Sequence, residues 1–91
     1  MDDAERFSLL GSACVWTCTV PPNDRMAYDD RQWRRALVVV EQGVLEVVCG
    51  TGERRVFTEG AVLYFDGLGL RWLVNPGVRP LLLTALSLRR R

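Results

Sequence analysis

The sequence has no histidine, no lysine and no isoleucine among its 91 residues. Without histidine, the chain lacks the usual general acid or base near neutral pH and the imidazole that most often binds metals. Without lysine, it cannot form a Schiff base with a carbonyl substrate. These absences weigh against several classes of enzyme. All 12 positive charges are arginine, which, together with the missing isoleucine, is typical of a GC-rich genome.

Cysteine is scarce, with one residue each at positions 14, 18 and 49. Cys14 and Cys18 lie four steps apart in one expected strand, roughly 13 Å, which is well beyond the ~7 Å that a disulfide spans. Without a Cys-x-x-Cys pair or a histidine, the thiols do not form a recognisable zinc site. We therefore expect free thiols, no metal or other cofactor, and a location in the reducing cytoplasm.

Long apolar runs and basic patches are also missing. No apolar run approaches the ~18 residues that a membrane helix needs, and the acidic start Met-Asp-Asp-Ala-Glu is unlike a signal peptide. The arginines are not interleaved with aromatic residues, and the isoelectric point is only about 7.7. We expect neither membrane nor nucleic-acid binding, and we expect Arg89–Arg91 to be a frayed basic end.

What is present indicates a single all-β domain spanning residues 1–91. Hydrophobic residues make up 48% of the chain and charged residues 25%, as in an ordinary globular domain. Residues 1–11 are expected to form a turn or an edge segment, and residues 12–88 a barrel. Short apolar or alternating segments, separated by glycine, proline and asparagine corners, predict strands at 12–20, 33–41, 44–49, 54–58, 61–65, 70–74 and 80–88.

Two of these strands, around residues 37–40 and 81–86, are apolar on both faces. In an antiparallel sheet this pattern means that the outer face is covered as well as the inner one. The chain is too short to cover that face itself, so a second copy is the natural cover. The sequence therefore predicts a homodimer.

Two segments resemble the cupin superfamily of small jelly-roll barrels. Leu37–Val47 is similar to the family's apolar strand, glycine turn and returning strand, with Gly43 in the turn. In Gly60–Asn75, the first and last residues keep the spacing of the family's second motif. The resemblance implies a compact antiparallel jelly-roll barrel of the cupin type with little or no helix.

The resemblance also identifies what is missing from the family's metal site. Arg71 stands where the second motif has a metal-binding histidine, and Ala36 stands where the first motif has a glutamate. The two histidines of the first motif would fall among residues 29–32, which are Asp-Asp-Arg-Gln. The fold therefore carries over without the metal or its chemistry, and a fold alone does not define a function.

Arg71 is the sharpest candidate site residue, because the resemblance points its side chain into the mouth of the barrel. A guanidinium partly shielded from water needs an anionic partner. One alternative is a carboxylate or phosphate of a ligand, bound in bidentate fashion. The other is an internal ion pair with one of the acidic residues Asp29, Asp30, Glu41 or Glu46.

Aromatic residues supply the other candidates. Trp16, Trp33 and Tyr64 are predicted to line an apolar pocket, although in a small core such residues are first of all filler. Tyr64 could also serve as a general acid. Trp72 alternates with Arg71 and is expected to face outward.

The sequence favours a metal-free small-molecule binding or sensor module that does not turn over its ligand. An alternative is a metal-independent isomerase, epimerase or cyclase, in which Arg71 stabilises charge and Tyr64 or a carboxylate transfers a proton. A third is a non-catalytic dimerisation scaffold whose barrel is filled by its own side chains. An open pocket beside Arg71 distinguishes the first two from the third.

Overall fold

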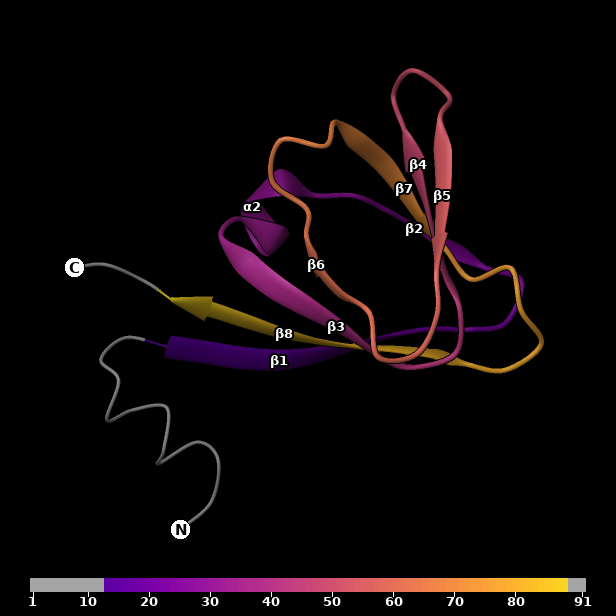
Figure 1. Ribbon diagram of the computed structural model, residues 1–91, viewed down its shortest axis with the longest axis horizontal. Coiled ribbons are helices and arrows are strands. Elements are labelled where there is room, and N and C mark those ends of the chain that lie inside the picture. The colour runs from indigo at the N-terminus through magenta and orange to yellow at the C-terminus, as the bar shows by residue number, and fades with distance from the viewer. Residues whose placement is uncertain (1–12, 89–91) are drawn as a thin grey trace, which may run out of the picture.

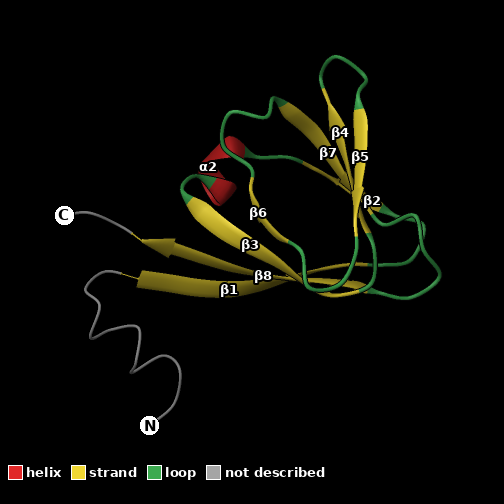
Figure 2. Ribbon diagram, in the orientation of Figure 1, coloured by secondary structure: helices red, strands yellow, loops and turns green. Residues whose placement is uncertain are grey.

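The computed structural model describes residues 13–88, which form eight strands and one short helix (Figures 1 and 2). The predicted turn at residues 1–11 and the basic end at 89–91 lie outside the described residues. In chain order the elements are β1 (Ala13–Val20), β2 (Arg25–Ala27), α2 (Asp30–Trp33), β3 (Ala36–Gln42), β4 (Leu45–Cys49), β5 (Arg54–Phe57), β6 (Val62–Tyr64), β7 (Leu70–Val74) and β8 (Leu81–Leu88).

The strands form two four-stranded antiparallel sheets, in the orders β1-β8-β3-β6 and β2-β7-β4-β5. The pairing is nested: β1 pairs with β8, β2 with β7, β3 with β6 and β4 with β5. Figure 1 shows the two sheets facing each other across the interior. Eight strands nested in this way make a jelly roll, so the predicted fold class is confirmed.

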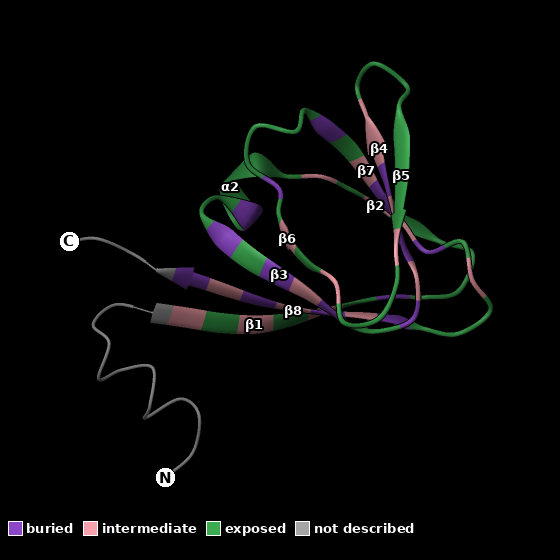
Figure 3. Ribbon diagram, viewed as in Figure 1, coloured by how far each residue is buried: buried purple, intermediate pink, exposed green. Residues whose placement is uncertain are grey.

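The core lies between the sheets and follows the alternation of the strands (Figure 3). In β1, Trp16, Cys18 and Val20 face inward, while Val15 and Thr17 are exposed. Alternation places every second side chain of a strand on the core side. The fully buried core residues of the other elements include Trp33, Val38, Val40, Leu45, Leu73, Leu81 and Leu83.

Two residues kept from the cupin motifs have structural roles in turns. Gly43 has a φ of +88°, and a Cβ there would lie only 2.8 Å from the carbonyl oxygen of Pro80, so no other residue fits the turn between β3 and β4. Asn75 is fully buried. Its amide donates to the carbonyl oxygens of Val20 at 3.0 Å and Arg79 at 2.7 Å, and accepts from the amide of Gly77 at 2.9 Å.

Every predicted strand has a counterpart, but β2 and α2 were not predicted. β2 is only three residues long and pairs with β7, which the local sequence does not indicate. In α2, the carboxylate of Asp29 accepts a hydrogen bond from the amide of Arg31 at 3.0 Å and caps a single turn. The helix is too short to produce a periodic apolar pattern.

Within residues 13–88, the helix is far too short to cross a membrane.

Candidate functional site

Four aromatic side chains meet inside the barrel, and we call Trp16, Tyr28, Trp33 and Phe65 the aromatic cluster. The ring centroids of Trp16 and Trp33 are 6.0 Å apart, those of Trp33 and Phe65 are 5.3 Å apart, and those of Tyr28 and Phe65 are 6.0 Å apart. The inner face of β1, the turn of α2 and the end of β6 bring these rings together. The structure therefore brings together two of the predicted site residues, Trp16 and Trp33.

The cluster contains two buried hydrogen-bond donors without acceptors. Within residues 13–88, neither the Nε1 of Trp16 nor that of Trp33 has a hydrogen-bond partner, and both atoms are shielded from solvent. Leaving a buried donor unpaired costs about 1–3 kcal/mol. An acceptor brought in by a bound molecule would remove that cost.

The inner face of β1 is only partly covered by the opposite sheet. Cys14, Trp16 and Cys18 face inward but stay half-buried, as do Met26 and Tyr28 near the edge strand β2. The thiol of Cys18 donates to the Sδ of Met26 at 3.4 Å, which links β1 to β2. Burial raises the pKa of Cys18, so the thiol stays neutral here. The partly covered part of this face is therefore lined by apolar side chains and a neutral thiol.

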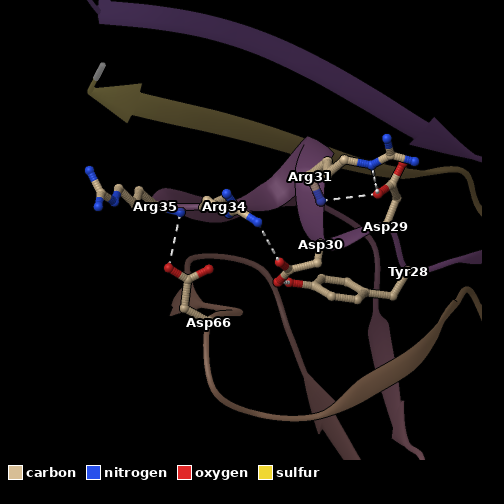
Figure 4. A network of polar contacts seen from close by, with 7 residues as sticks. All are labelled: Tyr28, Asp29, Asp30, Arg31, Arg34, Arg35 and Asp66. Carbon is tan, nitrogen blue, oxygen red and sulfur yellow. Dashed lines mark hydrogen bonds and ion pairs between the residues drawn. The ribbon is translucent and has the colours of Figure 1, made fainter. Parts of the chain in front are cut away.

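A polar network stands at the rim of the aromatic cluster (Figure 4). The hydroxyl of Tyr28 donates to Asp30 at 3.3 Å, and Arg34 forms an ion pair with the same carboxylate at 3.3 Å. Asp66 accepts the backbone amide of Arg35 at 3.0 Å. Burial, followed by the charge of Asp30, raises the pKa of Tyr28 to about 12. Near neutral pH this phenol can donate a hydrogen bond but does not act as a base.

Arg71 does not point into the barrel, and this expectation is wrong. The residue is exposed. Within residues 13–88, it forms no ion pair with any of the acidic residues that were expected as its partners. The cause is a shift in the register between β4 and β7: Trp72 pairs with Val48, but Leu70 pairs with Cys49. Leu70 takes the inner position, and Arg71 is the extra residue of a β-bulge.

Arg71 instead lines a groove of about 350 Å³ outside the β2-β7-β4-β5 sheet, together with Arg25, Arg54 and Trp72. An open pocket beside Arg71 therefore exists, although not inside the barrel. Whether Arg71 binds a ligand stays a prediction. Trp72 faces outward, as expected, and is half-buried beneath Arg25.

Tyr64 also lies outside the barrel, so its expected position in an interior pocket is wrong. The residue is 55% exposed and pairs with Leu37 in the outer face of the β1-β8-β3-β6 sheet. Its neighbour Phe65 is the residue that enters the aromatic cluster. Alternation along residues 61–65, with Leu63 and Phe65 on one face, is the signal that could have identified Phe65.

Solved structures share the fold of this chain. The crystal structure of a Cupin 2 conserved barrel domain protein from Salinispora arenicola matches with a TM-score of 0.65 and 21% identity, covering 84% of this chain. The chain adopts the cupin fold. It spans 62% of the length of that Salinispora protein. The Cupin_2 domain of an XRE family transcriptional regulator from Enterobacter cloacae matches with a TM-score of 0.68 and 21% identity, covering 87% of this chain and 84% of that domain.

By sequence, the chain matches no family model and no curated protein. At 21% identity, the similarity to the two crystal structures concerns the fold. The expected resemblance to cupins is thus confirmed at the level of architecture, and function has to be argued from the residues of this domain.

The residues of this domain do not fit the metal centre of the cupin family. The sequence has no histidine, and Arg71, in the place of a metal-binding histidine, is exposed. Across the part of the chain that the structure describes, no three cysteine, aspartate or glutamate side chains come together to hold a metal ion. A guanidinium carries a permanent positive charge and does not ligate metals.

Proposed function

We propose that this cupin domain is a metal-free module that binds a small molecule, or senses it, without turnover. The observation that carries the proposal is the pair of buried, unpartnered indole N–H groups of Trp16 and Trp33. They lie in neighbouring rings beside the half-covered inner face of β1. A ligand that accepts hydrogen bonds from both would remove the cost of two unpaired donors.

The surroundings of the two indoles suit an uncharged ligand. The buried polar residues of the described core are Asn75, whose amide is fully used, and Ser87, whose hydroxyl donates to the carbonyl oxygen of Arg34 at 3.4 Å. No buried cation or anion among these residues would balance a ligand charge, and an unbalanced buried charge is costly. The ligand we propose is therefore a neutral apolar molecule that carries a carbonyl or ether oxygen.

Two further features support a binding or sensing role over catalysis. Tyr28 is the titratable member of the aromatic cluster, and its raised pKa keeps the phenol protonated near neutral pH, so it does not act as a base there. One structural relative is the Cupin_2 domain of a transcriptional regulator, a setting in which a domain that binds a small molecule can act as a sensor.

We also propose that two copies pair through the outer face of the β1-β8-β3-β6 sheet. Apart from Glu41 and Gln42, which are exposed at the bulge that ends β3, its outward side chains are aliphatic, aromatic or threonine. We call this set the apolar face: Val15, Thr17, Thr19, Leu37, Val39, Val62, Tyr64, Leu82, Thr84 and Leu86. The strands of this sheet have 8, 8, 7 and 3 residues, so the face spans about 400 Å² at ~3.3 Å per residue and ~4.8 Å per strand. Two such faces together bury about 800 Å², the size of a small interface, so the dimer we propose is a weak one.

A reducing, cytoplasmic location is part of the proposal. Cys14, Cys18 and Cys49 are free and half-buried, and the pairing of Cys18 with Met26 uses a neutral thiol as a packing group. Such an arrangement suits a compartment that keeps thiols reduced.

Tryptophan fluorescence and native mass spectrometry test the binding proposal. Protein purified from its own host is expected to retain a neutral small molecule, seen as an added mass in the native spectrum. In vitro, acetophenone serves as a neutral aromatic probe with one carbonyl acceptor. We expect saturable binding of acetophenone, accompanied by a change in the emission of the buried indoles.

The chain offers a matched control, because Trp72 lies on the outside. Trp16→Phe removes one unpartnered N–H and is expected to weaken acetophenone binding about tenfold, whereas Trp72→Phe is expected to leave it unchanged. The proposal is wrong if the purified protein carries no ligand and acetophenone binds without saturation, or if both variants behave alike.

A further inference from the structure

The groove outside the β2-β7-β4-β5 sheet forms a second candidate site, separate from the aromatic cluster. Its volume is about 350 Å³, and three arginines line it, together with Trp72 and the glycines of the β4–β5 turn. We call it the arginine groove, after Arg25, Arg54 and Arg71. Pockets for small organic ligands commonly measure ~300–1,000 Å³, so the arginine groove is large enough for one small molecule.

Cross-strand pairing explains why these residues meet. Trp72 of β7 pairs with Val48 of β4, and Val48 pairs with Arg54 of β5. On the other side of β7, Arg25 of β2 pairs with Val74. The outward side chains of β4 and β7 thus form an apolar floor. Arg54 of β5 stands at one side of this floor, and Arg25 of β2 stands at the other. The β-bulge then adds Arg71 at the end of the floor.

Positive charge dominates the arginine groove. Arg54 forms an ion pair with Glu46 at 3.3 Å. The guanidinium of Arg25 stacks on the ring of Trp72 at 3.9 Å from its centroid, and the carboxylate of Asp24 accepts the backbone amide of Arg25 at 2.7 Å. Neither Arg25 nor Arg71 has an acidic side-chain partner within residues 13–88.

The stacking of Arg25 on Trp72 prepares the site for an anion. A guanidinium that stacks through its face keeps its N–H edge free, and that edge matches two oxygens of a carboxylate or phosphate. The stack also limits the rotamers of a long side chain, so less entropy is lost on binding.

We infer that the arginine groove binds a small organic anion: a carboxylate or phosphate group held by Arg25 and Arg71, joined to a flat apolar part that covers Val48 and Val74. This ligand differs in charge from the neutral molecule proposed for the aromatic cluster, so the inference does not depend on that proposal. The apolar floor favours an organic anion over inorganic phosphate, and the small volume of the groove, about 350 Å³, favours a small molecule over a nucleic acid.

Nuclear magnetic resonance titration of the intact chain tests this inference, with phenyl phosphate and benzoate as probes and benzyl alcohol as the neutral comparison. We expect saturable shifts of the indole N–H signal of Trp72 and of the amides of Gly50 and Gly52. The indole signals of Trp16 and Trp33 are expected to stay in place. Benzyl alcohol and inorganic phosphate are each expected to bind at least tenfold more weakly than phenyl phosphate.

Three methionine variants separate a built site from general attraction of charge. Arg71→Met and Arg25→Met each remove one charge-assisted contact and are expected to weaken phenyl phosphate binding about tenfold or more. Arg31→Met removes the same charge from α2, outside the groove. Within residues 13–88, the exposed side chain of Arg31 forms one ion pair, with Asp29 at 3.9 Å. This variant is expected to change the affinity less than twofold. All three arginines are exposed, so the variants are expected to keep their melting temperature.

Several outcomes would overturn the inference. Equal weakening by all three variants would mean that the whole positive surface attracts the probe. Shifts of Trp16 and Trp33 in place of Trp72 would move the anion to the aromatic cluster. Tighter binding of a single-stranded oligonucleotide than of phenyl phosphate, with the same dependence on Arg25 and Arg71, would make the groove part of a nucleic-acid surface.

Discussion

The two sheets present different outer faces, although they share one core. The paired outward side chains of the β1-β8-β3-β6 sheet, such as Leu37 and Tyr64, are uncharged, and the one charged residue of β3, Glu41, lies at the bulge near the end of that strand. The β2-β7-β4-β5 sheet instead places Arg25, Arg54 and Glu46 outward around Trp72. The inner faces are fixed by the need to fill one core, so the outer faces are where each sheet can take a separate role: self-association for one and recognition of a charged ligand for the other.

The largest expected effect comes from placing a charge in the apolar face. Leu86 lies on β8, an inner strand of this sheet, and is paired with Val15 on one side and Leu37 on the other. Leu86→Arg is expected to abolish the proposed dimer at micromolar concentration, because two uncompensated charges would be buried in the interface. Sedimentation velocity measures the outcome.

Val56→Arg is the matched control, because Val56 is 57% exposed on the outer face of the other sheet. This variant is expected to stay dimeric. A monomer at micromolar concentration in the unmodified protein would contradict the proposed difference between the faces.

The next largest effect is expected from removing a hydrogen bond that joins the two sheets. Asn75 follows β7 in one sheet and binds the carbonyl oxygen of Val20 at the end of β1 in the other. Asn75→Ala leaves buried backbone groups unpaired and is expected to lower the free energy of unfolding by about 2–4 kcal/mol, or the melting temperature by about 10 °C or more. Thermal unfolding followed by circular dichroism measures it.

Asn23→Gly provides the comparison for this variant. Asn23 is exposed and has a φ of +59°, which glycine adopts readily. We expect no loss of stability. If Asn75→Ala were equally harmless, the two sheets would be held together by their core alone.

A smaller effect concerns Tyr28, in the core between the two sheets, and the dependence of stability on pH. The pKa of Tyr28 is raised to about 12 from its ordinary value of 10. The folded state therefore holds the phenolic proton more tightly than the unfolded state. This contribution to stability is complete below pH 10 and is lost as the pH rises through 12. Urea unfolding at a series of alkaline pH values measures the loss.

Tyr28→Phe is expected to flatten this alkaline loss, whereas Tyr64→Phe, on the apolar face, is expected to leave it in place. The same alkaline slope in the wild type and in Tyr28→Phe would show that the loss comes from other groups, such as the arginine and carboxylate pairs near α2.

The smallest effect tests how charge is balanced in the arginine groove. Glu46→Gln removes the acidic partner of Arg54 and is expected to tighten phenyl phosphate binding two- to threefold. Stability is expected to change by only about 0.5 kcal/mol, as for other ion pairs near the surface. Glu53→Gln, which frees Arg55 outside the groove, is expected to leave the affinity unchanged. Equal gains in both variants would indicate an effect of net charge alone.

Much of the fold could be predicted because its signals are local. The alternation of Trp16, Cys18 and Val20 defined the inner face of β1, and the glycine and asparagine corners separated the strands. Gly43 and Asn75 kept their motif spacing because each is held by backbone atoms in close contact. These constraints act over a few residues and leave a direct trace in the sequence.

The site was harder to predict because its geometry depends on distant pairing. Alternation alone places Arg71 with Leu73, on the inner face, but the β-bulge opposite β4 moves it out and Leu70 in. The stacking of Arg25 on Trp72 depends on the three-residue strand β2 pairing with β7. By contrast, the outward position of Tyr64 follows from simple alternation with Phe65, so the error there came from assigning a pocket role to the wrong neighbour.

The nested pairing of the strands has a consequence for how the chain assembles during synthesis. β4 and β5 adjoin in the sequence and can form a hairpin as soon as both have left the ribosome. β8 lies between β1 and β3, and among the strands of residues 13–88 β1 pairs with β8 alone, so this pairing cannot form until β8 has been made. Contacts that close such long loops form slowly. The sheet that carries the apolar face is therefore completed after the other sheet, and the proposed self-association through that face would have to wait until β8 has been made.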